Sequence, residues 1–119
     1  MSTTETNIQK EIRLHLSRQG ALSLRYQVGT FFTLDGRYVD IGEVGASDLI
    51  CCVPITITPD MVGKRIGVFA AIETKKVNDS TTKKRKEAQG KFLDRIRALG
   101  GFATIARNTA DVDNAIKIL

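Results

Sequence analysis

The chain has 119 residues, 42% of them hydrophobic and 26% charged, with a net charge of +5. This length fits a single domain, residues 1–119, and the composition excludes a disordered chain. The longest apolar runs are too short for a membrane span, and no secretory signal opens the chain, so we expect a cytoplasmic protein. The positive charge favours a polyanionic partner.

Cysteine and histidine are too few for a structural zinc site. Cys51 and Cys52 are adjacent within an apolar run, where successive side chains of a strand point to opposite faces, so we expect reduced core thiols. His15 is the single histidine and is assigned no role. We also expect no organic cofactor.

Residues 4–19 predict an amphipathic first helix, and Gly20 follows as a stop signal. The apolar positions recur every four residues, at Ile8, Ile12 and Leu16. The candidate caps are Ser2, Thr3 and Thr4. Residues 21–33 are rich in strand-forming side chains, and Asp35 and Gly36 then predict a hairpin turn.

Residues 41–47 contain two glycines without sustained periodicity, which predicts an irregular loop leading to Asp48. Residues 49–58 and 65–76 are apolar segments that predict two central strands. Residues 77–86 then turn polar and basic, which marks a loop that runs into a helix.

The last part of the chain predicts a helix, a strand and a helix. The second long helix has apolar positions at helical spacing, namely Ala88, Phe92, Ile96 and Leu99, before Gly100. Residues 102–106 predict a buried strand, and Thr109 is the predicted cap of a last helix with Asp111 near its positive end. This order predicts an α/β or α+β protein with one layer of sheet.

Charged residues at the ends of two apolar strands are the most informative feature. Asp48 begins one strand, while Glu73 and Lys75 end the other and share a face because strand side chains alternate. If the two strands are antiparallel neighbours, Asp48 meets Glu73, and two such carboxylates favour Mg²⁺ or Mn²⁺ between them. The alternative to a metal site is that Asp48 caps a strand and that Glu73 and Lys75 form a surface ion pair.

These residues resemble the VRR-NUC branch of the PD-(D/E)XK nucleases. Glu73-Thr74-Lys75 matches the E-x-K motif, and the segment from Gly42 to Ile50 resembles the glycine-rich approach to the metal-binding aspartate. Three further matches in the same order are the segment starting at Glu5, the strand starting at Arg25, and Gln89 in the helix after E-x-K.

The resemblance implies a restriction-endonuclease-like αβββαβ core, with a central mixed sheet flanked by helices. Asp48, Glu73 and the carbonyl of Thr74 would bind the metal, and Lys75 would assist the attacking water. Glu5 and Gln89 are supporting members, although Glu11 is a rival to Glu5 on the first helix. A basic segment without a proline precedes Gln89, which departs from the family pattern.

Several side chains are candidates for contact with DNA. The basic positions are Arg25, Lys76, Lys83, Lys84, Arg85 and Lys86. They would contact phosphates without reading the base sequence, unless the cluster is simply a solvated helix start. Three aromatic residues of the strand region, Tyr26, Phe31 and Tyr38, either stack on bases or belong to the core.

The expected function is therefore metal-dependent hydrolysis of structured, branched DNA. Resemblance to stand-alone viral members implies a Holliday junction resolvase, in which a homodimer makes two symmetric cuts. Such a protein fits a phage setting and the cytoplasm of the host. The alternatives are a flap or branch nuclease and a basic nucleic-acid-binding module without catalysis.

Overall fold

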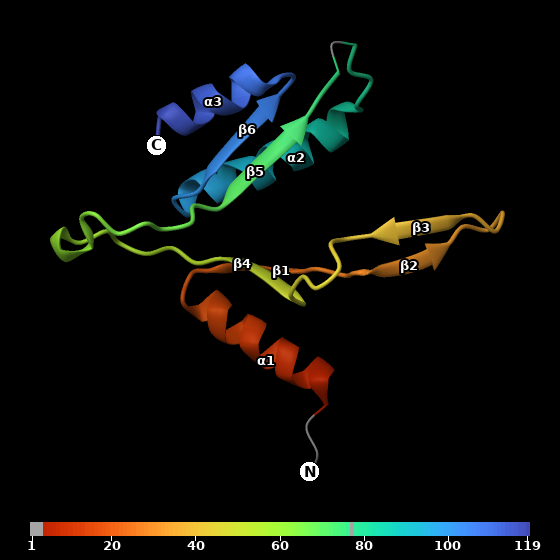
Figure 1. Cartoon of the computed structure of the whole chain (residues 1–119), viewed down its shortest axis with the longest axis horizontal. Helices are drawn as coiled ribbons and strands as arrows, with labels where there is room; N and C mark the ends of the chain where they lie inside the picture. The colour runs from red at the N-terminus through yellow and green to blue at the C-terminus, as the bar shows by residue number, and fades with distance from the viewer. Residues whose placement is uncertain (1–3, 77) are drawn as a thin grey trace. The chain divides into compact units, whose positions relative to one another are not determined.

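The computed structural model describes residues 4–76 and 78–119 and divides into two compact units, Met1–Val53 and Pro54–Leu119. Figure 1 shows the helices and strands of each unit. Both units mix helix with strand, which agrees with the α+β class predicted from the sequence. That residues 1–119 are a single domain stays a prediction. Within the described residues, none of the helices has the length and apolar content to span a bilayer.

The first unit places its helix before two antiparallel strand pairs. Its elements are α1 (Glu5–Arg18), β1 (Leu22–Arg25), β2 (Gly29–Phe32), β3 (Tyr38–Ile41) and β4 (Leu49–Cys52). β1 pairs with β4, and β2 pairs with β3. The predicted hairpin turn joins β2 to β3, where Gly36 has a φ of 84°. Ala21 and Cys52 are buried, and both cysteines are free thiols as predicted.

Thr4 caps α1. Its hydroxyl oxygen accepts a hydrogen bond of 3.2 Å from the backbone N–H of Asn7, one of the donors that has no partner inside the helix. The other two candidate caps, Ser2 and Thr3, lie outside the described residues.

The second unit is built around a parallel strand pair. Its elements are η1 (Pro59–Met61), β5 (Ala70–Thr74), α2 (Lys83–Ala98), β6 (Phe102–Ala106) and α3 (Thr109–Lys117). β5 and β6 run parallel, with Glu73 opposite Ile105, and α2 and α3 both pack on β6. The buried side chains are those of Leu93, Ile96, Ala103, Ala106 and Ala115. Ile96 is fully buried and centres this core.

Gly101 lets α2 turn tightly into β6. A side-chain carbon at this position would lie 2.6 Å from the carbonyl oxygen of Phe69 and 2.8 Å from the Ile96 side chain. The backbone N–H of Gly101 also donates to the carbonyl of Ile96. The glycine therefore permits the close approach that places β6 beside β5.

Several predicted boundaries are wrong. The strand expected over residues 49–58 ends at Cys52, two residues before Pro54, which has no N–H for a ladder hydrogen bond. The strand expected over residues 65–76 is shorter, Ala70–Thr74, and matches its partner β6 in length. Within the described residues, the sheets are three separate strand pairs. Residues 77–86 were predicted to be a loop that runs into a helix, and α2 begins within this segment, at Lys83; the first residue of the segment, Val77, lies outside the described residues.

Thr109 does not cap the last helix. The cap is Asn108, whose side-chain oxygen accepts a hydrogen bond of 2.9 Å from the backbone N–H of Asp111. An Asn side chain suits this position at least as well as a Thr, which explains the shift by one residue. Asp111 lies in the first turn, as predicted, and also accepts from the N–H of Arg107.

Candidate functional site

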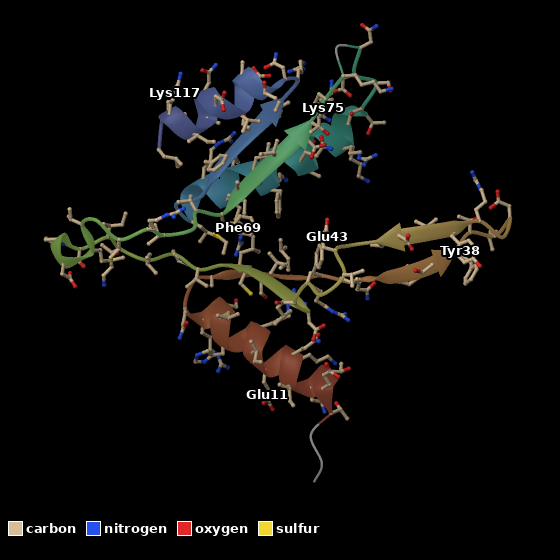
Figure 2. All side chains as sticks on the ribbon, in the orientation of Figure 1. Glu11, Tyr38, Glu43, Phe69, Lys75 and Lys117 are labelled. Carbon is tan, nitrogen blue, oxygen red and sulfur yellow. The ribbon has the colours of Figure 1, made fainter. Side chains whose placement is uncertain are left out.

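Glu73 and Lys75 lie at the end of β5. Because one residue separates them, alternation along the strand sends both side chains to the same side. The backbone N–H of Lys75 donates to the carbonyl of Ala106 over 3.1 Å, so pairing with β6 continues one residue past the strand. The parallel ladder thereby fixes the backbone from which Lys75 projects, beside α2 in Figure 2.

The side-chain amide of Gln89 joins these two charged residues. Its oxygen accepts a hydrogen bond of 2.8 Å from Lys75 Nζ, and its nitrogen donates a hydrogen bond of 2.8 Å to Glu73 Oε1. Lys75 Nζ also lies 3.8 Å from the same oxygen of Glu73. The Lys75 side chain is only 6% exposed, whereas that of Glu73 is 34% exposed. The predicted members Glu73, Lys75 and Gln89 are therefore brought together by the second unit.

The start of α2 sets the position of Gln89. Thr82 caps this helix by accepting from the backbone N–H of Arg85 over 3.3 Å, so α2 begins at Lys83 without a proline. Gln89 then lies almost two turns into the helix and is half-buried. Its side chain faces the end of β5 because the helix packs against β5 and β6.

Two residues of this cluster were missed from the sequence. Asp79 and Thr81 lie in the segment between β5 and α2, and Thr81 Oγ1 is 3.0 Å from Lys75 Nζ. Asp79 Oδ2 lies 3.8 Å from Lys75 Nζ and 3.7 Å from Lys86 Nζ. The available signal was an acidic residue four positions after Lys75 and a run of turn-forming residues, which ordinarily indicates only a loop.

Hydrogen bonds from the Thr81 hydroxyl and from the Thr81 backbone N–H lower the pKa of Asp79 to about 2. The nearby ammonium groups of Lys75 and Lys86 act in the same direction, whereas partial burial opposes them. Asp79 is therefore ionised throughout the neutral range, and it faces an ammonium that solvent hardly reaches.

A pocket of about 270 Å³ opens beside this cluster. Its lining includes Glu73, Thr74, Lys75 and Gln89 together with two of the predicted basic positions, Lys76 and Arg85. The side chain of Lys76 is exposed, as are those of the other predicted DNA contacts in this unit, Lys83, Lys84 and Lys86. The pocket therefore has carboxylate and carbonyl oxygens, one buried ammonium and a basic margin.

In the first unit, the glycine-rich loop delivers the chain to Asp48. Gly42 and Gly45 have φ values of 76° and 86°, which residues with a side chain rarely adopt. A side-chain carbon on Gly42 would lie 2.7 Å from the carbonyl oxygen of Gln27. The next backbone N–H, that of Glu43, donates to the Tyr26 hydroxyl over 3.1 Å. The loop is thus held against the segment that follows β1.

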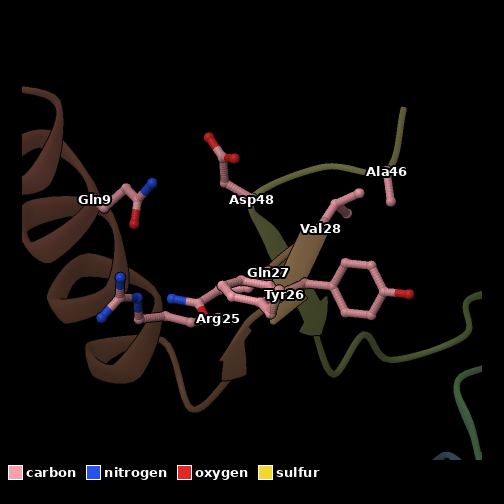
Figure 3. Close-up of a pocket in the computed structure, with 8 residues that line it drawn as sticks. Gln9, Arg25, Tyr26, Gln27, Val28, Ala46 and Asp48 are labelled. Carbon is pink, nitrogen blue, oxygen red and sulfur yellow. The ribbon is translucent and has the colours of Figure 1, made fainter. Parts of the chain in front are cut away.

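Asp48 and Arg25 line one pocket of about 390 Å³, shown in Figure 3. The carbonyl of Asp48 accepts a hydrogen bond of 2.8 Å from the backbone N–H of Tyr26, which continues the pairing of Arg25 with Leu49. The Asp48 side chain is exposed, and its carboxylate makes no hydrogen bond or ion pair among the residues that the structure describes. The other polar residues of the lining are Gln9 of α1, Tyr26 and Gln27.

The remaining predicted residues of this unit are more peripheral. Glu5 is the exposed first residue of α1 and, unlike Gln9 one turn later, is not part of the pocket lining. Its rival Glu11 is also exposed. His15 is an exposed helix residue whose ring lies 3.1 Å from the Gln19 amide.

The aromatic residues of the first unit are not core residues. Tyr26 and Phe31 line the Asp48 pocket, and Phe31 is 44% exposed. Tyr38 is 72% exposed and contacts Phe32, with ring centroids 4.9 Å apart and ring planes tilted by 46°. Burial in the core therefore does not apply to Phe31 or Tyr38, whereas Tyr26 is half-buried.

The oxygen donors suit a hard divalent cation. Both contacts that the Glu73 carboxylate makes with described residues use Oε1, which leaves Oε2 as an oxygen donor. The Asp48 carboxylate and the Thr74 carbonyl are further oxygen donors. Carboxylate and carbonyl oxygens are donors that suit Mg²⁺ and Mn²⁺. Residues 4–76 and 78–119 contain no group of three or more His, Cys, Asp or Glu side chains placed to hold a metal ion. Asp48 belongs to the first unit and Glu73 to the second, and the predicted pairing of their strands stays a prediction.

Comparisons with protein-family models, curated proteins and solved structures find no match to this chain.

Proposed function

We propose that this protein is a metal-dependent endonuclease that hydrolyses phosphodiester bonds in branched DNA. The observation that carries the proposal is the Gln89 amide, which bonds both Lys75 Nζ and Glu73 Oε1 at 2.8 Å while the Lys75 side chain is 6% exposed. A surface ion pair does not need such a bridge, because water serves exposed charges equally well. A catalytic site does need such a bridge, because it must hold a carboxylate and an ammonium in fixed positions.

The fold that we propose is the restriction-endonuclease-like αβββαβ core. Helix α1, the strands β1 to β5, α2 and β6 occur in an order compatible with that arrangement. The pairing of β5 with β6 supports its second half, because a parallel pair joined through α2 is the expected β-α-β unit.

The carboxylates of Asp48 and Glu73 and the carbonyl of Thr74 are the proposed ligands of Mg²⁺ or Mn²⁺. When bound, the metal would supply a nucleophilic water at neutral pH and neutralise charge on the phosphate. Glu73 can bind a cation through Oε2 while Gln89 holds Oε1, so the amide orients the carboxylate without occupying both of its oxygens. The Asp48 carboxylate has no ion-pair partner among the described residues, so its negative charge is free to bind the metal.

Lys75 is proposed to orient the attacking water or to stabilise the charge that develops on the phosphoryl oxygens. An ammonium has three hydrogens, and two of those on Lys75 Nζ are donated to Gln89 and Thr81. The third is left for a water or a phosphate oxygen. Because Nζ is held by hydrogen bonds of 2.8 Å and 3.0 Å, the ammonium needs little reorganisation to act on the substrate.

The positive charges around both pockets suit DNA. Lys83, Lys84, Arg85 and Lys86 fill the first turn of α2, where cations oppose the helix dipole and a polyanion would offset that cost. Arg25 shares the other pocket with Asp48. We propose that these residues contact phosphates, and that Phe31 and Tyr26 offer surfaces on which unpaired bases can stack.

Among endonucleases that cut branched DNA, we propose that this protein is a homodimer that resolves four-way junctions. Resolution needs two symmetric cuts, and a two-fold dimer supplies two sites. The proposed interface comprises exposed apolar residues of the β2–β3 hairpin and of the end of the chain, including Phe32, Leu34, Tyr38, Ile118 and Leu119. Sedimentation and strand-by-strand mapping of cuts in an immobile junction test this form, since a monomer that cuts only flaps would overturn it.

Cleavage of a panel of DNAs tests the function itself. The panel contains an immobile four-way junction, a flap, a linear duplex and a single strand, each with Mg²⁺ or Mn²⁺. We expect cleavage of branched substrates by the wild-type protein and none by Glu73→Gln, which keeps the side-chain volume. Binding by both proteins without cleavage by either would instead establish a nucleic-acid-binding module.

A further inference from the structure

The segment between β5 and α2 carries Thr81, which accepts from Lys75 Nζ, and Asp79, to which the proposed chemistry gives no part. The hydrogen bond from Lys75 Nζ to Thr81 is 3.0 Å long, and Asp79 Oδ2 lies 3.8 Å from the same nitrogen. The Asp79 side chain is 16% exposed and that of Lys75 is 6% exposed. The contact is therefore largely shielded from water, unlike the surface ion pairs of the chain.

The direction of these hydrogen bonds is determined by the Thr81 hydroxyl, which has a single hydrogen. The hydroxyl donates it to Asp79 Oδ1 over 2.5 Å, so its lone pair faces Lys75 Nζ and accepts. The backbone N–H of Thr81 donates to the same carboxylate oxygen over 2.9 Å. Asp79 thus sets the orientation of the Thr81 hydroxyl, and the hydroxyl in turn sets the position of the Lys75 ammonium.

Helix capping does not account for this arrangement. The N-cap of α2 is Thr82, which serves the Arg85 N–H with its own side chain. Asp79 accepts from Thr81, before the helix begins, and its second oxygen is directed to Lys75 and Lys86. The turn therefore presents a carboxylate to the ammonium in addition to leading into α2.

We propose that Asp79 and Thr81 are positioning residues for Lys75. Gln89 holds the ammonium from the helix side, and Thr81, oriented by Asp79, holds it from the loop side. The two acceptors together define the direction of the third N–H of Lys75. This inference rests on the proposed nuclease function for its effect on catalysis, but the positioning itself is measurable without any substrate.

Amine labelling measures the positioning directly. The protein is reductively methylated with limiting formaldehyde, and peptide mass spectrometry gives the rate at Lys75 relative to exposed Lys76 as an internal reference. Thr81→Val removes the hydroxyl at nearly constant shape, and Asp79→Asn removes the charge. We expect both variants to lose most of the protection of Lys75, whereas Thr81→Ser keeps the hydroxyl and the protection.

Asp94→Asn is the matched charge control, because Asp94 is 77% exposed and, within residues 4–76 and 78–119, pairs only with Arg97 on the helix surface. Protection of Lys75 should be unchanged in this variant. Unchanged protection in both Thr81→Val and Asp79→Asn would overturn the proposal, whatever the protein does to DNA. Circular dichroism of each variant establishes that the labelled protein is folded.

Cleavage kinetics separate positioning from a merely structural role. On the branched substrate that the wild type cuts, Thr81→Val and Asp79→Asn should lower kcat by about 10- to 100-fold, the usual effect of losing a group that orients a functional side chain. KM should stay constant, and Thr81→Ser should restore kcat. A normal kcat in Thr81→Val would overturn the proposal. If the wild type cuts no DNA at all, the nuclease function fails, and labelling still decides the positioning of Lys75.

Discussion

Gln89→Met is the most informative perturbation of the site. Methionine has nearly the length and volume of glutamine, but it can neither accept from Lys75 nor donate to Glu73. Both 2.8 Å hydrogen bonds are therefore lost together, while the packing of α2 against the strands is conserved. We expect a less stable protein whose Lys75 is held only by Thr81.

The size of the effect follows from the exposure of the two partners. Lys75 is 6% exposed, so its lost bond leaves a shielded charged donor and costs about 1.5 to 3 kcal/mol. Glu73 is 34% exposed, so water replaces most of its lost bond and the cost is about 0.5 to 1 kcal/mol. The free energy of unfolding should therefore fall by about 2 to 4 kcal/mol.

Urea unfolding followed by circular dichroism measures this loss. Gln27→Met is the control, because Gln27 is exposed. The midpoint of its urea unfolding should equal that of the wild type. Equal midpoints for Gln89→Met and the wild type would refute the reasoning, since they would mean that the amide bridge contributes nothing to holding the buried ammonium.

Three further predictions concern the loop before Asp48, the basic helix start and the acidic turn. Gly42→Ala should destabilise the protein by about 1 to 3 kcal/mol in urea unfolding, because it adds left-handed strain and a close contact with a carbonyl. Replacing Lys83, Lys84 and Arg85 by Gln should weaken binding to all DNAs and reduce the salt slope of affinity by about 2 to 3, as titration at several salt concentrations will show. The pKa of Asp79 is about 2, below the ordinary value of 3.8 for an aspartate. The ionised Asp79 carboxylate therefore stabilises the folded protein above pH 3.8, and this contribution is lost as the pH falls toward 2. The difference in unfolding free energy between the wild type and Asp79→Asn should shrink as the pH falls over that range.

Local elements were predictable because their signals are contained in a few adjacent residues. Gly20 after an apolar period of four residues marks the end of α1, and β6 has the predicted bounds 102–106. Asp35 and Gly36 give the hairpin turn by their turn chemistry alone. Caps and strand ends were less well predicted, since Asn108 and Thr109 are both good caps and strand length depends on the partner strand.

The candidate site was predictable only in part. The E-x-K pattern with Gln89 identified three residues that the structure joins through hydrogen bonds. Asp79 and Thr81 were missed because nothing in a polar turn indicates that its side chains point back to a lysine at the end of a strand. That contact depends on where α2 begins and how it packs, which is tertiary information.

Binding of Mn²⁺ tests the central claim most directly. Electron paramagnetic resonance titration of free Mn²⁺ measures how many ions each chain binds, with no need to know the DNA substrate. One proposed centre uses both Asp48 and Glu73, so the wild type and the control Asp94→Asn should each bind one Mn²⁺ per chain. Asp48→Asn and Glu73→Gln should each lose that binding. Retention of the ion in both of these single variants would contradict the account.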